Sequence, residues 1–185
     1  LVGLVFAVVG VAGFAFGVPL FGVIATAFAL FAAFLNAAFG ICLGCQALAA
    51  VLAARVYPGK QKELGWDELT LTKEGKASPL GVLEGVRILN WHGDTFDLPV
   101  GATRFASTPI TPNQAFAYGP KVLALQFHVE LPERDLEKWL IGHTLELATS
   151  KVDLGKMRAE TARYAPPVNA ASRKLFNTWL DGLSA

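Results

Sequence analysis

The first 54 residues of this 185-residue chain contain no Asp, Glu, Lys, Arg or His. All sixteen Lys and Arg and all fifteen Asp and Glu lie between Arg55 and Ala185, a stretch whose charged fraction is that of an ordinary globular domain. The chain has no basic run and a formal net charge of only +1, so it offers no electrostatic footprint for nucleic acid. Two cysteines in a chain of this length exclude a disulfide-built scaffold. The length suits one domain with a sizeable core.

Residues 1–39 are almost wholly Ala, Val, Phe, Leu and Gly and allow three interpretations. Hydropathy alone permits one or two membrane spans. Alternatively, the glycines and Pro19 divide the segment into short pieces, of which Leu1–Val11 is typical of a strand buried in a parallel sheet. Val23–Leu35 would then be a covering helix, yet it lacks the polar face that such a helix shows to water. The third interpretation, which we favour, is that this anomalous apolar segment is incomplete or misassigned.

Gly40-Ile-Cys42-Leu-Gly44-Cys45-Gln46 has the form of a nucleophile elbow between a strand and a helix. The helix dipole at such a turn favours the Cys42 thiolate, and the backbone N–H of Leu43 points to where an oxyanion develops. Cys42 could instead be a small apolar side chain packed against the glycines. The Cys42-x-x-Cys45 spacing also permits a dithiol redox pair, whereas zinc would need further ligands that the scattered histidines do not supply.

A second chemical signal lies at the end of the apolar stretch from Lys121, which we predict to be a strand running to His128 and Glu130. Strand alternation places His128 and Glu130 on the same side, so Glu130 can orient the imidazole while its other nitrogen faces a nucleophile. The alternative is a strand end that carries a solvated Glu and a partly buried His. Pro132 then stops the strand. Nucleophile, base and orienting carboxylate together make the general triad arrangement.

These motifs resemble class I glutamine amidotransferases, especially stand-alone proteins similar to the glutaminase domain of GMP synthase. The segments that carry the resemblance are GICLGCQ (40–46), ELGWDELTLT (63–72), NWHGDTFDLP (90–99), NQAFAYG (113–119), QFHVE (126–130) and WLIGHTLELA (139–148). The resemblance implies that Cys42 is the nucleophile, His128 the general base and acid, and Glu130 its partner. It also places Gln46, Trp91, His92, Gly93 and Asp94 around the substrate. Gly17-Val18-Pro19 matches weakly the loop whose backbone would give the second oxyanion-hole N–H.

The implied reaction is hydrolysis of the L-glutamine side-chain amide through a Cys42 thioester, with no metal and no organic cofactor. The resemblance further implies a cytoplasmic enzyme that supplies ammonia to a partner synthase. A γ-glutamyl peptidase would use the same triad. Two other classes predict different behaviour: a membrane-anchored protein with a non-catalytic domain, and a dithiol redox protein that needs both Cys42 and Cys45.

We expect an α/β fold over residues 1–185, a single glutamine amidotransferase domain of flavodoxin-like architecture with a mostly parallel open sheet and helices on both faces. Residues 132–185 should form a helical tail. In it, His143 has the spacing of a core histidine, and Ala165–Pro167 should be a joint before a last helix, Pro167–Leu183. The helix should pack on the domain through one face, formed by Val168, Leu175, Trp179 and Leu183.

Overall fold

The computed structural model describes residues 51–183, and the chain divides into two compact units, residues 1–50 and 51–185. All the described residues belong to the second unit. The predicted strand Leu1–Val11, the predicted helix Val23–Leu35 and the elbow Gly40–Gln46 lie outside the described residues. The single-domain organisation over residues 1–185 therefore stays a prediction.

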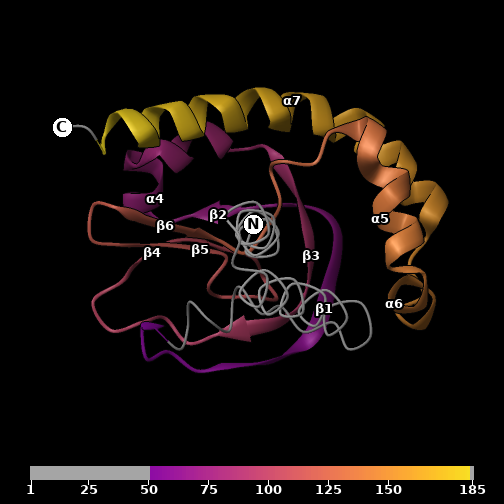
Figure 1. Ribbon diagram of the computed structural model, residues 1–185, viewed down its shortest axis with the longest axis horizontal. Coiled ribbons are helices and arrows are strands. Elements are labelled where there is room, and N and C mark those ends of the chain that lie inside the picture. The colour runs from indigo at the N-terminus through magenta and orange to yellow at the C-terminus, as the bar shows by residue number, and fades with distance from the viewer. Residues whose placement is uncertain (1–50, 184–185) are drawn as a thin grey trace, which may run out of the picture. The chain divides into compact units, whose positions relative to one another are not determined.

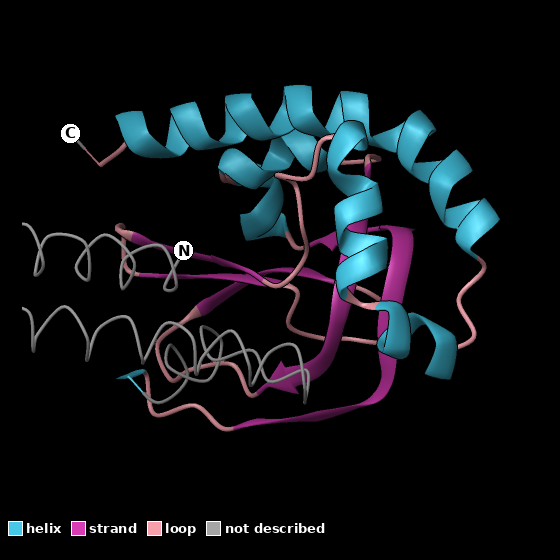
Figure 2. Ribbon diagram, turned by 45° about the vertical axis from the view of Figure 1, so that its right-hand side comes forward, coloured by secondary structure: helices cyan, strands magenta, loops and turns pink. Residues whose placement is uncertain are grey.

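Two antiparallel sheets form the centre of this unit (Figures 1 and 2). The first pairs β1 (Val56–Glu68) with β3 (Arg87–Phe96), in a register that places Glu63 opposite His92. The second has the order β2-β4-β5-β6, with bounds Thr70–Leu71, Thr103–Ser107, Ala115–Tyr118 and Val122–Leu125. Gly119, in the turn between β5 and β6, has a φ of +60°, a left-handed conformation that glycine adopts without strain.

Helices cover one side of these sheets. The short helix α4 (Lys73–Ala77) and the 3-10 turn η1 (Pro79–Leu83) connect β2 to β3. After β6 come the 3-10 turn η2 (Glu133–Asp135), α5 (Leu136–Gly142), α6 (Thr144–Thr149) and the 28-residue α7 (Leu154–Asp181). Figure 1 shows α7 crossing above α4, with α5 and α6 beside β3. The expected helical C-terminal extension is confirmed.

Helix α7 buries one regular face. Its buried residues are Met157, Thr161, Ala165, Val168, Ser172 and Leu175, a spacing of three or four that is the period of an α-helix. The prediction that Val168 and Leu175 pack on the domain is confirmed, since both are buried, and Trp179 is partly so. The predicted joint at Ala165–Pro167 is wrong, because the helix runs through both prolines. Pro166 and Pro167 lie on its exposed side, where the missing N–H groups leave no buried carbonyl behind.

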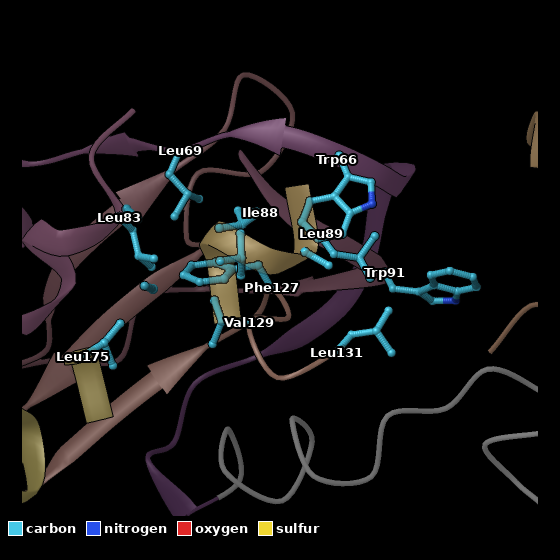
Figure 3. Close-up of a cluster of buried hydrophobic side chains, with 14 of the residues drawn as sticks. Trp66, Leu69, Leu83, Ile88, Leu89, Trp91, Phe127, Val129, Leu131 and Leu175 are labelled. Carbon is cyan, nitrogen blue, oxygen red and sulfur yellow. The ribbon is translucent and has the colours of Figure 1, made fainter. Parts of the chain in front are cut away.

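The core lies between the sheets and α7. Trp66 of β1, Ile88 and Leu89 of β3, and Leu175 of α7 meet there, as Figure 3 shows. Phe127, Val129 and Leu131 enter the same cluster from the segment that follows β6, and each is at most 4% exposed. Burial of these alternate residues fixes which way their neighbours point, so the core itself orients His128 and Glu130.

The mixed α/β class is confirmed, but the local pairing differs from the expected parallel sheet. Every strand pair among residues 51–183 is antiparallel, and the strand expected to be parallel, residues 1–11, is not described. The predicted strand from Lys121 to Glu130 also divides. Its pairing with β5 ends at Leu125, after which the chain crosses to β3, where the His128 N–H donates to the Leu89 carbonyl at 2.7 Å.

Candidate active site

His128 and Glu130 lie on one side of the chain, as strand alternation predicts. Their neighbours Phe127, Val129 and Leu131 point into the core, which leaves the intervening side chains outside it. The Nδ1 of His128 lies 2.7 Å from Oε1 of Glu130. Because a carboxylate only accepts hydrogen bonds, Nδ1 carries the proton and Nε2 is the nitrogen that can accept one.

The Glu130 carboxylate is held at both oxygens. Oε2 accepts a hydrogen bond from the Val129 backbone N–H at 2.9 Å, while Oε1 accepts from His128. Partial burial alone would raise the pKa of Glu130, but the hydrogen bonds and the charge of His128 outweigh it and lower the pKa below its ordinary value. Glu130 is therefore an anion near neutral pH, fixed in position to orient the imidazole.

The imidazole of His128 also packs against an indole. The Trp139 ring, from α5, lies 4.7 Å from the His128 ring centroid, at 90° to its plane. Such an edge-to-face contact limits rotation of the imidazole about its side-chain bonds. The side chain of His128 remains 29% exposed, so a substrate or water molecule can reach it.

His92 belongs to β3 and takes part in a network of mostly buried side chains. Its Nε2 is 3.5 Å from Oε2 of Glu63, the residue opposite it on β1, and 3.3 Å from Nε2 of Gln114. Burial lowers the pKa of His92 more than the Glu63 carboxylate raises it. His92 is therefore neutral near pH 7 and is unsuited to hold a positive charge.

The other predicted substrate residues fall on both sides of β3. Trp91 packs against Trp139 and His143, and its indole N–H donates to Glu146 at 3.2 Å. Alternation along β3 puts His92 on the opposite face from Trp91. The Asp94 carbonyl accepts from Gln126 Nε2 at 2.5 Å, and a Cβ on Gly93 would press against the Lys62 side chain.

The structure adds three residues that the motif analysis did not assign to the site, Glu63, Thr108 and Gln114, all buried. Glu63 and Gln114 stand within two of the segments that carry the family resemblance, and that was their only signal. A cavity of about 410 Å³ extends beside β1, lined by residues 62–67, among them Glu63, by Asn90 and Ile110, and by residues near the start of α7.

Cys42, Leu43, Gln46 and Val18 lie outside the described residues, as does Cys45. Within residues 51–183, no three His, Cys, Asp or Glu side chains are grouped so that they could hold a metal ion. No helix in that same part of the chain is long and apolar enough to cross a membrane.

Comparison with known sequences gives one family match and several relatives. Residues 1–53 match the family described as Domain of unknown function (DUF4395). A glutamine-hydrolysing GMP synthase of Porphyromonas gingivalis is 34% identical over 116 residues, which are 62% of this chain and 23% of that protein. A glutamine amidotransferase-like protein of Salmonella typhimurium is 33% identical over 114 residues, 60% of this chain and 48% of that one. The chain thus covers less than half the length of these relatives.

Comparison with solved structures gives the same result. A glutamine amidotransferase from Thermotoga maritima shares 35% identity and a TM-score of 0.67, over 75% of this chain and 60% of that one. A glutamine amidotransferase from Methylobacillus flagellatus has a TM-score of 0.68 at 21% identity, which shows the shared fold. In its fold and in the motifs at Glu63, His92 and His128, the chain is similar to class I glutamine amidotransferases.

Proposed function

We propose that this chain hydrolyses the side-chain amide of L-glutamine to glutamate and ammonia, with Cys42, His128 and Glu130 as its triad. The observation that carries the proposal is the 2.7 Å hydrogen bond between His128 and an anionic Glu130. It leaves Nε2 of a partly exposed imidazole available for proton transfer. The elbow at Gly40–Gln46 supplies a nucleophile suited to that base.

In this mechanism the Cys42 thiol gives its proton to His128, and the thiolate attacks the amide carbon of glutamine. The tetrahedral intermediate carries an oxyanion, for which the backbone N–H of Leu43 and that of Val18 are the proposed donors. When the carbon–nitrogen bond breaks, His128 gives the proton to the leaving amine, and ammonia departs. A γ-glutamyl thioester on Cys42 remains.

The second half of the reaction consumes one water molecule. His128 takes a proton from the water as the oxygen attacks the thioester carbon, and the carbon–sulfur bond then breaks. Glutamate leaves, and His128 returns its proton to the Cys42 sulfur, which restores the thiol. Neither half of the reaction requires a cofactor. Because one relative is a GMP synthase, we propose an ammonia-accepting synthase as the partner.

Two measurements test the proposal. The intact protein is incubated with a glutamine-like diazo ketone, and the adduct is located by peptide mass spectrometry. Ammonia release from glutamine is measured for the wild type, for Glu130→Gln and for Glu133→Gln. Glu133 is an exposed carboxylate three residues away and serves as the matched control.

We expect the adduct on Cys42 and a kcat about 10²- to 10⁴-fold lower for Glu130→Gln, because an amide no longer holds the correct tautomer of His128. Glu133→Gln should keep wild-type activity. Absence of both the adduct and ammonia release would refute the proposal. A preference for γ-glutamyl dipeptides over glutamine would reassign the chain as a peptidase, and a requirement for Cys45 would favour redox chemistry.

A further inference from the structure

Among residues 51–183, no Lys or Arg binds the buried carboxylate of Glu63, which lies beside the predicted substrate segment. The Glu63 side chain is only 4% exposed, and its sequence neighbour Lys62 forms its ion pair with Glu146 instead. Burying an ionised carboxylate is costly unless hydrogen bonds satisfy it. Two do: Thr108 Oγ1 donates to Oε1 at 2.6 Å, and Gln114 Nε2 donates to Oε2 at 2.8 Å.

The amide of Gln114 extends this network to β3. The same Nε2 that binds Glu63 lies 3.3 Å from Nε2 of His92. Since the other ring nitrogen faces the Asp94 backbone, Nε2 of the neutral imidazole is an acceptor for the second amide hydrogen of Gln114, which Thr108 Oγ1 shares at 3.3 Å. Gln114 is itself fully buried, so its orientation is fixed by these partners.

The network ends on the backbone of the segment from Trp91 to Asp94. The Asp94 carbonyl accepts from Gln126 Nε2 at 2.5 Å, and the imidazole of His92, on the same strand, also bonds the Asp94 backbone, so β3 is tied here to the segment that follows β6. A network that fixes a backbone carbonyl also fixes the neighbouring groups that a ligand would meet. The network begins at a buried carboxylate, and burying a charged group destabilises the fold unless the group is fully hydrogen-bonded. We therefore interpret Glu63 as a residue that holds its neighbours in position.

We propose that Glu63 is a positioning residue which, through Gln114 and His92, holds residues 91–94 in the conformation that binds the amino-acid part of the glutamine substrate. This inference rests on the proposed glutaminase function. It assigns the network to substrate binding and leaves proton transfer to His128 and Glu130. Loss of the network should therefore raise KM far more than it lowers kcat.

The test uses the full chain with two variants in the network and one outside it. Glu63→Gln removes the charge with little change of shape, and Gln114→Leu removes the bridge between Glu63 and His92. Thr95→Val is the matched control: Thr95 lies on the same strand β3, is 7% exposed, and its hydroxyl has no partner among the described residues. Thermal unfolding of each variant shows whether it is folded.

For folded Glu63→Gln and Gln114→Leu we expect KM for glutamine to rise at least tenfold, with kcat changed less than threefold. Labelling by the glutamine-like diazo ketone should slow in parallel. Labelling of Cys42 by iodoacetamide, which needs no amino-acid pocket, should keep its wild-type rate. Thr95→Val should match the wild type in all four measurements.

Unchanged KM in both folded variants would overturn the inference and leave the proposed function standing. So would a fall in kcat at constant KM, because that is the result of a purely structural role that reduces the amount of active protein. A wild-type chain that neither releases ammonia nor reacts with the diazo ketone would refute the proposed function, and this inference with it.

Discussion

Replacing Asn169 by Ala tests whether α7 supports the segment that carries His128 and Glu130. Asn169 Nδ2 donates to the carbonyls of Val129 and Leu131 at 3.2 and 3.1 Å, on either side of Glu130. Each hydrogen bond contributes about 0.5–1.5 kcal/mol, so two contribute about 1–3 kcal/mol. Alanine regains about 0.5 kcal/mol through its higher helix propensity. The expected net loss of unfolding free energy is therefore about 0.5–2.5 kcal/mol.

Asn177→Ala is the control, because Asn177 lies on the exposed side of the same helix and gains the same propensity. Thermal unfolding followed by circular dichroism should place the Tm of Asn169→Ala below that of Asn177→Ala. At about 2–4 °C per kcal/mol for a protein of this size, the difference should be about 4–8 °C for a 2 kcal/mol effect. Equal Tm values would refute the reasoning that Asn169 holds the segment.

Three further predictions concern stability. The pKa of His92 is lower in the folded chain than the ordinary value of 6.5, so below pH 6.5 the unfolded chain binds more protons than the folded chain. The stability that is present above pH 6.5 is therefore lost as the pH falls. His92→Gln should flatten this dependence by up to about 1.4 kcal/mol per pH unit in urea unfolding between pH 7.5 and 5.5, and an unchanged slope would contradict the burial argument. Leu175→Ala, at a fully buried position, should lower the free energy of unfolding by about 2–5 kcal/mol in the same assay. Leu180→Ala, at a half-exposed position, should lower it little. Similar losses for the two variants would show that α7 does not pack as described. Gly75→Ala should cost about 3 kcal/mol or more, or prevent folding, because the new Cβ would overlap the Phe105 carbonyl oxygen; a wild-type Tm would exclude that close approach.

Sequence predicted the orientation of His128 and Glu130 because that orientation is local. An alternating apolar pattern at Phe127, Val129 and Leu131 is enough to put the two ionisable side chains on the other side. The pattern does not show which strand is the partner. After Leu125 the segment changes its pairing partner from β5 to β3 through a long-range contact with Leu89. An apolar run in the sequence does not predict such a contact.

The prolines of α7 show a second limit of prediction from the sequence. Pro166-Pro167 predicts a break by local rules, since each proline removes a helical hydrogen bond. The buried face on both sides of the pair, from Met157 to Leu175, outweighs that local cost through packing against the core. Glu63 illustrates the same point for the candidate site: its hydrogen bonds come from Thr108 and Gln114, which are more than forty residues away in the sequence.

The three histidines of the described unit are held in three different ways, and this contrast is the physical reason to select His128 as the base. His143 uses its Nδ1 on the Trp139 carbonyl, one turn back in its own helix region, at 2.9 Å. His92 is neutral and only 12% exposed, with Nε2 facing Gln114 and Glu63 and the ring also bonded to the Asp94 backbone. His128 alone of the three combines an anionic partner at Nδ1 with access to solvent. A residue that must gain and lose a proton within one turnover needs a partner that stabilises its charged form, and among residues 51–183 only Glu130 supplies that to an accessible imidazole.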